Sequence, residues 1–422
     1  MTYHVNIEKD GLQIHVGILS GDQPENTVFA YAPAYLAAED AAPISLSLPL
    51  QEAAFSPAKT KNYFDSLLPE GYTRQTVAQW IHADADDYLT ILHALGCECL
   101  GALQITAEGE AHGASYEPLA LEQVKALAAE GASKSAELVI TSHLSLAGAT
   151  GKVGLYYDGK TWFLPRGTAP STHIIKQSHV RLKHIVQNEQ LTLLTAKNCG
   201  LPVPESFIVN TGNGADEEIL FAAGRYDRVF PKTGRLIDGL PAPLRLHQED
   251  FAQALGIPAS QKYERTDENH LARMFDLLRR HSADPIRDMT RLWDQIVFNW
   301  LIGNTDAHVK NFSLLYSPDL RTLRLAPAYD LLAAAIYPTT RELSFRIGGT
   351  ATVNTVTEAS FEVAAREAGL GVRMAMQRYH RMVDAFVPAL RAASKALQAE
   401  GFPEAAEIAE QILQTGGIAL TK

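Results

Sequence analysis

The most informative stretch of this sequence is Gly303-Asn304-Thr305-Asp306-Ala307-His308-Val309-Lys310-Asn311. The segment before it predicts a long amphipathic helix, because its apolar residues recur at three- and four-residue steps. These residues are Met289, Leu292, Trp293, Ile296, Val297, Trp300 and Leu301. Gly303 fits the position that ends such a helix, so we expect the polar residues after it to lie on a loop fixed to a buried element.

This loop places Asp306 five residues before Asn311, and a second carboxylate, Asp330, follows 24 residues after Asp306. The first spacing is typical of the catalytic loop of protein kinases, in which an Asp takes the proton of the substrate hydroxyl and an Asn holds Mg²⁺. Asp306 is therefore the candidate base. Asn311 and Asp330 are the candidate hard-oxygen ligands of Mg²⁺. We expect His308 to lie near the phosphates of ATP.

Two simpler interpretations of the same residues stay open. Asp306 could cap a helix beside a surface His308, because Asp and Asn are common after helices. A zinc site at Asp306 and His308 would need a third ligand at a recognised spacing, and none follows nearby.

Composition restricts the class of protein. A chain of 422 residues with 46% hydrophobic and 20% charged residues can bury a large core and is not disordered. Its net charge of -11 argues against nucleic-acid binding by the chain as a whole. Three cysteines are too few for a disulfide framework, and we expect Cys97 and Cys99 to be buried thiols. We find no signal peptide and no apolar run that could span a bilayer, so a cytoplasmic location is expected.

The pattern predicts three parts in an α+β chain. Residues 1–105 form a β-rich module, residues 106–238 an α+β lobe, and residues 239–422 a mostly helical lobe. Their lengths fit the prior of about three domain-sized units for a chain of this size.

Several elements can be predicted within these parts. Runs at 12–17 and 44–48 are β-like, and 173–176 is a strand candidate. Asp158-Gly159 lies between two aromatic-rich runs, which predicts a β-hairpin. The segment 188–199 is helical and ends before a glycine and a proline.

A second candidate for phosphate binding precedes the hairpin and reads Ser145-Leu146-Ala147-Gly148-Ala149-Thr150-Gly151-Lys152. Its small residues would let the backbone approach phosphate oxygens, and Lys152 adds positive charge. It fits neither the Walker A pattern nor the kinase glycine loop, so alone it indicates a turn. The order of this loop, Lys176 on a strand and Glu189 on a helix is nevertheless that of a kinase N-lobe. Lys176 is thus a candidate to bind phosphates and pair with Glu189, and the alternative is a surface lysine on an edge strand.

Taken together, these segments resemble the HipA-type serine/threonine kinases, the toxins of bacterial type II toxin-antitoxin modules. The resemblance covers nearly the whole chain and keeps the family's order. The matching segments are 65–71, 145–152, 172–176, 188–189, 200–204, 224–228, 247–256, 301–311 and 327–331.

The resemblance implies a two-lobed kinase-like fold with an additional N-terminal β-rich module and a mostly helical C-terminal lobe. It implies that Asp306 is catalytic, that Asn311 and Asp330 bind Mg²⁺, and that Lys176 binds ATP. The phosphate loop would consist of Ala147, Gly148, Ala149, Thr150, Gly151 and Lys152.

The resemblance also implies that Tyr226 and Asp227 line the adenosine pocket. Ser145 would be autophosphorylated, which ejects the loop and inactivates the enzyme. The chain departs from the family at Thr150 and Gly151, where Gln and a bulkier residue are common. It also departs at Gly224, where an acidic residue often stands.

The expected function is that of an ATP- and Mg²⁺-dependent toxin kinase that phosphorylates a translation-related protein such as an aminoacyl-tRNA synthetase. The expected partner is a small helix-turn-helix antitoxin similar to HipB, which would supply the DNA contacts, and no membrane is involved. One alternative is a nucleotide-binding pseudokinase that acts as a corepressor with its antitoxin. Another is a metal-dependent hydrolase centred on Asp306 and His308.

Overall fold

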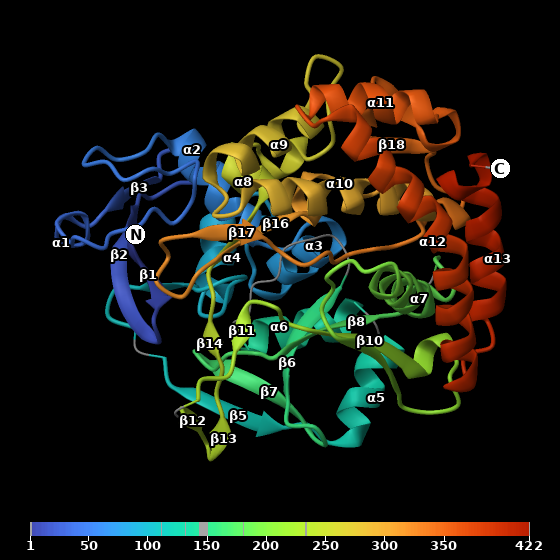
Figure 1. Ribbon diagram of the computed structural model, residues 1–422. Helices are drawn as coiled ribbons and strands as arrows, with labels where there is room; N and C mark the ends of the chain where they lie inside the picture. Colours follow the sequence, from blue (N-terminus) through green and yellow to red (C-terminus); the bar gives the residue numbers. More distant parts are fainter. Residues whose placement is uncertain are drawn as a thin grey trace. The chain divides into compact units, whose positions relative to one another are not determined.

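The computed structural model describes residues 2–110, 112–130, 132–142, 151–179, 181–232 and 234–421. It has the α+β fold predicted from the sequence (Figure 1). The chain forms two compact units. The first comprises Met1–Gln177, Ala222–Ala259 and Leu315–Thr322, and the second Ser178–Phe221, Ser260–Leu314 and Leu323–Lys422. The boundaries of these two units differ from those of the three parts predicted above, and the three-part division stays a prediction.

The N-terminal part of the first unit is an antiparallel sheet. Its strand order is β3 (Val28–Tyr31), β2 (Leu12–Ser20), β1 (Thr2–Lys9) and β4 (Leu103–Ala107). Strands β1 and β2 pair along their whole length (Figure 1). The β-rich character expected of this module is therefore present, and the run at 12–17 lies in β2.

A second sheet of the first unit carries the predicted hairpin. The strands that lie wholly in this unit have the order β5 (Ala114–Pro118), β7 (Trp162–Gly167), β6 (Lys152–Tyr157) and β8 (His173–Gln177). Strands β6 and β7 pair through Tyr156 and Phe163, and the Asp158 side chain accepts the N–H of Thr161 at 2.7 Å. The hairpin at Asp158-Gly159 and the strand at 173–176 are thus confirmed.

The remaining strands and helices of the first unit are short. The strands are β11 (Arg228–Val229), β12 (Leu236–Ile237), β13 (Leu240–Pro241), β14 (Leu244–Arg245) and β15 (Gln248–Asp250). The helices are α1 (Pro33–Leu36), α2 (Pro57–Phe64), α3 (Gly71–Trp80), α4 (Tyr88–Leu95), α5 (Leu121–Glu130), α6 (Ala132–Ser142) and α8 (Phe251–Leu255).

The strand expected at 44–48 is wrong. The segment forms a turn in which the only pairing is an isolated bridge between Ser45 and Leu48. Its polar groups bond to distant side chains instead of a neighbouring strand. Glu249 accepts the Ser45 hydroxyl at 2.5 Å, and the Tyr31 hydroxyl accepts the N–H of Ile44 at 2.9 Å. These long-range bonds outweigh the local β preference.

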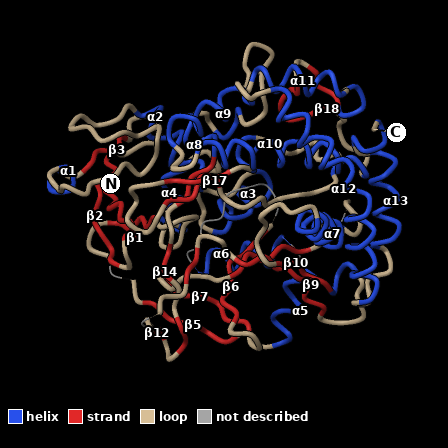
Figure 2. Tube along the Cα trace, in the orientation of Figure 1, coloured by secondary structure: helices blue, strands red, loops and turns tan. Residues whose placement is uncertain are grey.

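The second unit is mainly helical (Figure 2). Its helices are α7 (Ile185–Asn198), α9 (His270–His281), α10 (Pro285–Ile302), α11 (Glu358–Glu367), α12 (Val372–Ala399) and α13 (Ala405–Thr415). Its strands are β9 (Ser206–Asn210), β17 (Leu323–Leu325), β18 (Glu342–Ile347) and β19 (Thr350–Thr352). Two further strands, β10 (Ile219–Gly224) and β16 (Ser313–Tyr316), run from one unit into the other.

Helix α10 follows directly from the sequence. The Asp284 side chain caps its start by accepting the N–H of Arg287 at 3.2 Å, and Pro285 occupies its first turn. Its apolar stripe is buried apart from the half-buried Met289, with Trp293 and Trp300 among the largest fully buried side chains. A buried α10 is therefore a rigid support for the loop that follows it.

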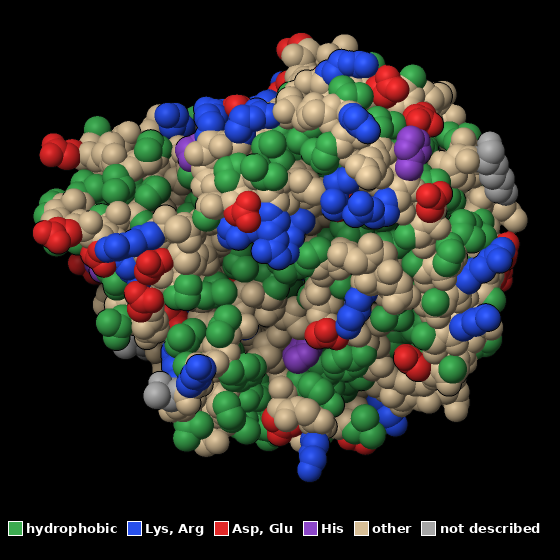
Figure 3. Space-filling model, viewed as in Figure 1, with side chains coloured by type: hydrophobic (Ala, Val, Ile, Leu, Met, Phe, Trp, Pro, Cys, Tyr) green, Lys and Arg blue, Asp and Glu red, His purple; other side chains and the backbone are tan. Residues whose placement is uncertain are grey.

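The surface carries both signs of charge. On the face shown in Figure 3, Lys and Arg side chains stand in small groups separated by acidic and apolar side chains. Among the described residues, no helix is both long enough and apolar enough to cross a membrane.

Candidate active site

The loop after α10 begins at a glycine that no other residue could replace without strain. Gly303 has a left-handed backbone, with φ of 70°. A Cβ at this position would lie 2.7 Å from the Cβ of Ala335 and 3.1 Å from the Cα of Gly416. Both the dihedral angle and the packing therefore require glycine, and they fix the direction in which the loop leaves the helix.

Asn304 links the two segments that carry the predicted site residues of the second unit. Its Nδ2 donates to Oδ1 of Asn299 at 2.7 Å and to the carbonyl of Asp330 at 3.2 Å. Its Oδ1 accepts the N–H of Asp306 at 3.2 Å. The side chain is buried, so these bonds form in a low-dielectric environment and hold both segments to the end of α10.

Asp306 lies exposed within a tightly bonded turn. Its carbonyl accepts the N–H of His308 and Nδ2 of Asn311, each at 2.8 Å. The Tyr263 hydroxyl donates to Oδ1 of the Asp306 carboxylate at 2.6 Å. A carboxylate at the surface of an otherwise buried loop is accessible to a second molecule, as a catalytic base must be.

His308 is buried, which contradicts the interpretation of a surface histidine beside a capping Asp. Burial, aided by the positive charges of Lys262 and Lys310, holds the pKa of its imidazole well below the usual 6.5. The ring is therefore neutral at pH 7. Any contact with ATP phosphates would be made by a neutral group, and such a contact stays a prediction.

Asp330 has a strained backbone that helix α7 holds in place. Its φ is 53°, in the left-handed region that residues other than glycine rarely adopt. Just after it, the Ala333 N–H donates to Oδ1 of Asn188 at 3.1 Å, and the Asn188 Nδ2 donates back to the Ala333 carbonyl at 3.2 Å. The Thr192 hydroxyl donates to the carbonyl of Leu331. Strain held this firmly is common at functional sites.

Within the first unit, two predicted ATP-binding lysines face each other. Lys152 on β6 pairs in register with Lys176 on β8, so their side chains project from the same face of the sheet. Gly151 precedes β6 and is described, whereas Ser145, Ala147, Gly148, Ala149 and Thr150 lie outside the described residues.

Asp227 is part of a buried ion-pair network that we call the arginine cluster. In it Arg225, Arg228 and Arg245 meet Glu8, Glu98 and Asp227. Asp227 accepts Arg225 Nε at 2.9 Å, the Gly101 N–H at 2.8 Å and Gln248 Nε2 at 2.9 Å. Burial would raise the pKa of this carboxyl, but the arginines beside it lower the pKa instead. Its carboxylate is thus committed to the cluster, and a contact with adenosine stays a prediction, as it does for Tyr226.

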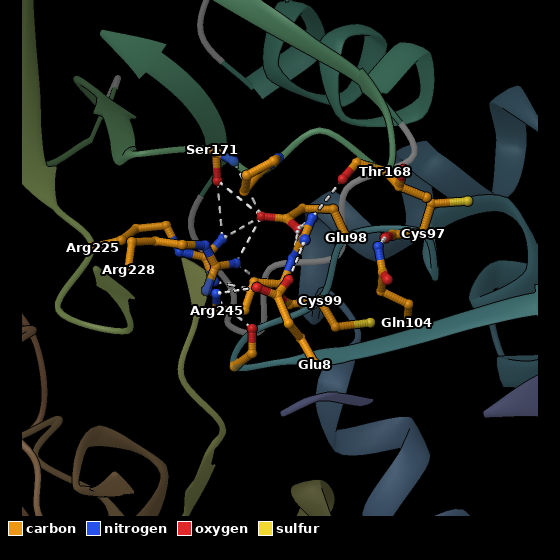
Figure 4. Close-up of polar contacts among 12 residues, drawn as sticks. Glu8, Cys97, Glu98, Cys99, Gln104, Thr168, Ser171, Arg225, Arg228 and Arg245 are labelled. Atoms are coloured by element: carbon orange, nitrogen blue, oxygen red, sulfur yellow. Dashed lines mark hydrogen bonds and ion pairs between the residues drawn. The ribbon is translucent and has the colours of Figure 1, made fainter. Parts of the chain in front are cut away.

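Glu98 lies at the centre of the arginine cluster (Figure 4). It accepts Arg228 at 2.7 Å and Arg225 at 3.2 Å through Oε1, and Arg245 Nε at 2.7 Å through Oε2. Burial would raise its pKa, but the three guanidinium groups outweigh burial and lower the pKa to about 2. The neighbouring Cys97 and Cys99 are buried free thiols, as expected.

The second unit therefore brings together Asp306, His308, Asn311 and the segment of Asp330. Glu189 lies buried on α7, and its pairing with Lys176 stays a prediction. In the part of the chain that the structure describes, no three His, Cys, Asp or Glu side chains form a metal-binding group. The described residues thus add no ligand to the zinc interpretation.

Sequence reasoning missed three contributors to these arrangements: Tyr263, the bridging role of Asn304, and the arginine cluster around Glu98. Asn304 could have been suspected, because it is a polar residue directly after a helix end. Tyr263 precedes Asp306 by 43 residues, and no sequence pattern links the two.

Comparison with known proteins covers most of the chain. Residues 144–390 match the HipA-like C-terminal domain and residues 12–106 the HipA N-terminal domain. A putative kinase of Sinorhizobium fredii is 33% identical over 89% of this chain and 88% of its own length. The serine/threonine-protein kinase toxin HipA of Shewanella oneidensis is 27% identical over 78% of this chain and 75% of its own.

A solved structure shares the fold. The Shewanella oneidensis complex of HipA, HipB and operator DNA contains a chain that aligns with a TM-score of 0.79 at 23% identity, over 97% of this chain and 96% of that one. This match shows the fold, and the class of protein, a serine/threonine kinase, follows from the relatives named above. The chain belongs to the HipA family, since the C-terminal domain match alone covers more than half of it.

Proposed function

We propose that this chain is an ATP- and Mg²⁺-dependent protein serine/threonine kinase that acts as the toxin of a toxin-antitoxin pair. The observation that carries the proposal is the turn in which Asn311 bonds to the Asp306 carbonyl at 2.8 Å while the Asp306 carboxylate stays exposed. This turn stands at the end of buried α10, so its geometry is preorganised for catalysis.

Asp306 is the base in this proposal. It accepts the proton of a serine or threonine hydroxyl as that oxygen bonds to the γ-phosphorus of ATP. The bond between the γ-phosphorus and the oxygen that bridges it to the β-phosphate breaks, and ADP leaves with the electron pair. Phosphoryl transfer needs little covalent work from the protein, so orienting the hydroxyl is the main task of Asp306.

Asn311 and Asp330 fit the role of Mg²⁺ ligands. The Asn311 Nδ2 donates to the Asp306 carbonyl, so the amide oxygen would be the atom that binds a metal. Amide and carboxylate oxygens are hard ligands of the kind that Mg²⁺ prefers. When bound, Mg²⁺ would neutralise charge on the ATP phosphates.

Lys152 and Lys176 are proposed to bind the phosphates from the first unit. Their opposed placement on β6 and β8 puts two positive charges on one face of the sheet. Ammonium groups are strong partners of phosphate oxygens, which supports a phosphate-binding role. The loop of Ala147, Gly148, Ala149, Thr150 and Gly151 precedes Lys152 and is proposed to complete this site.

The partners are proposed by analogy with the relative. The solved complex of the Shewanella oneidensis protein contains HipB and operator DNA. With a net charge of -11, the present chain would reach DNA mainly through a helix-turn-helix antitoxin. A translation-related protein such as an aminoacyl-tRNA synthetase is the proposed target.

The decisive experiment is incubation of the purified chain with γ-labelled ATP, Mg²⁺ and host-cell protein. Transfer of label to serine or threonine is expected. A nucleotide-binding pseudokinase that serves as corepressor would bind ATP and transfer no label.

Asp330→Ala is expected to abolish the Mg²⁺-dependent part of the thermal stabilisation by ATP, because the variant lacks a metal ligand. Differential scanning fluorimetry with ATP, with and without Mg²⁺, measures this. Asp267→Ala, which removes an exposed carboxylate of the same unit, is the matched control and should keep the full effect. Undiminished stabilisation of the Asp330→Ala variant would show that Asp330 does not bind the metal.

Ser145 is proposed as the autophosphorylation site. A phosphate adds about -1.5 to -2 charge at pH 7 and would repel bound ATP, so the phosphorylated loop should be ejected. Mass spectrometry after incubation with Mg-ATP should find one phosphate on Ser145 in the wild type and none in Asp306→Asn. Phosphate found only at other residues would contradict this assignment, as would unchanged ATP affinity of the phosphorylated chain.

A further inference from the structure

Tyr263 contacts the proposed catalytic base directly. Its hydroxyl donates to Oδ1 of Asp306 at 2.6 Å, a short distance that is typical of an O–H donor to a carboxylate. The tyrosine is 48% exposed, so this hydrogen bond lies at the surface and not in a packed core. An exposed aromatic side chain gains little from burial, and its placement needs another explanation.

The residue beside Tyr263 anchors the segment. The Glu264 side chain is only 3% exposed and its carboxylate accepts the N–H of His270 at 2.6 Å and that of Arg346 at 2.9 Å. The Arg346 Nε lies 3.1 Å from the same carboxylate. The Glu264 N–H donates to the carbonyl of Ser344 at 2.8 Å. Tyr263 therefore projects from a backbone that is fixed at the next residue.

Strand β18 bonds to the residues next to Tyr263 and Asp306. Its Ser344 accepts the Glu264 N–H through its carbonyl and donates its hydroxyl to the carbonyl of Thr305 at 2.8 Å. Thr305 directly precedes Asp306, and Glu264 directly follows Tyr263. The tyrosine hydroxyl and the carboxylate are thus positioned from one strand, which limits their relative movement.

The ring of Tyr263 is also restricted. It meets the buried His308 ring edge-on, with centroids 5.3 Å apart and an interplanar angle of 85°. Edge-to-face pairs are favourable for aromatic rings at this distance. The ring contact and the anchored backbone together direct the hydroxyl towards Asp306.

We infer that Tyr263 is a positioning residue for phosphoryl transfer, which orients the Asp306 carboxylate towards the acceptor hydroxyl through its hydrogen bond to Oδ1. An ionised carboxylate offers about four lone-pair directions. A donor that occupies one of them fixes the rotation of the carboxylate, and thereby the direction in which the others accept a proton. This inference rests on the proposed role of Asp306 as the base.

Tyr263→Phe removes the hydroxyl and keeps the ring against His308. We expect kcat to fall by roughly 10- to 100-fold, the effect of losing one hydrogen bond to a charged group. The KM for ATP and the Mg²⁺-ATP thermal stabilisation should stay at wild-type values, because Tyr263 acts on the base and not on the nucleotide. Steady-state kinetics with labelled ATP measures both. Tyr72→Phe, at a tyrosine that is 61% exposed on α3, is the matched control and should leave kcat unchanged.

A double variant separates positioning from other roles. In an Asp306→Asn background, Tyr263→Phe should cause no further loss, since there is no base left to orient. A further 10-fold loss there would overturn the inference. The inference would also be overturned if kcat of Tyr263→Phe equals or exceeds that of the wild type, because the contact would then be inhibitory. Phosphate found on Tyr263 by mass spectrometry would overturn it as well. Failure of the proposed function is distinct, because Asp306→Asn by itself would then keep its activity.

Discussion

The Asp306→Asn variant is expected to transfer phosphate roughly 10²- to 10⁴-fold more slowly than the wild type, the usual contribution of a positioned base. Asn has nearly the same size and can still accept the Tyr263 hydroxyl, so the turn at the end of α10 should persist. What is lost is the negative charge and the capacity to take a proton. Single-turnover transfer from γ-labelled ATP measures the rate.

ATP binding should change little in this variant, because the base does not hold the nucleotide. Binding can be followed by isothermal titration calorimetry in the presence of Mg²⁺. Asp267→Asn makes the same chemical change at an exposed position of the same unit and should leave the rate unaffected. If the Asp306→Asn variant transfers phosphate at a rate within a few-fold of the wild type, Asp306 is not the base.

The Glu98→Gln variant is expected to lose roughly 3 to 5 kcal/mol in free energy of unfolding, the cost of removing one partner from a buried ion pair. Three arginines donate to this carboxylate, and the side chains of Glu98 and Arg225 are 1% and 0% exposed. The neutral amide of the variant would no longer balance the positive charges of Arg225 and Arg228 in a low-dielectric interior. Urea denaturation followed by circular dichroism measures the shift in midpoint.

The matched control is Glu117→Gln, which breaks the ion pair with Arg166 on the surface of the same unit. There the expected loss is about 0 to 1 kcal/mol, because water screens exposed pairs. Equal losses for the two variants would refute the structural importance of the arginine cluster.

The pH dependence of the Glu98 contribution follows from the direction of the pKa shift. The folded pKa is lowered to about 2 from the ordinary 4.5, so the stabilising contribution is present above pH 4.5 and is lost as the pH falls towards 2. The difference in stability between wild type and Glu98→Gln should shrink over this range.

Several elements were predictable because their causes are local. The apolar spacing of 289–301 and the glycine at 303 defined α10 and its end, and Asp158-Gly159 defined the hairpin of β6 and β7. The five-residue step from Asp306 to Asn311 similarly belongs to a single turn, which one hydrogen bond closes. Short-range patterns of this kind predict backbone geometry, because that geometry is determined by residues close together in the sequence.

Other features depend on residues that are distant in the chain. Ile44 to Leu48 has a β-like composition, yet Glu249 binds it as a turn across more than 200 residues. Glu98 looked like an unremarkable residue between two cysteines, and only folding surrounds it with Arg225, Arg228 and Arg245. Buried polar groups need hydrogen-bond partners, and the fold can supply them from distant parts of the chain. The spacing of residues in the sequence therefore does not predict which partners these are.

The proposed catalytic base shows both kinds of information. The amino-acid sequence was sufficient to identify Asp306 as the candidate, because its helix, glycine and amide partner are consecutive in the chain. The orientation of its carboxylate depends on Tyr263 and on Ser344 of β18, which lie 43 residues before it and 38 after it. Side-chain direction is set by packing and hydrogen bonds in three dimensions, so only the tertiary structure could reveal it.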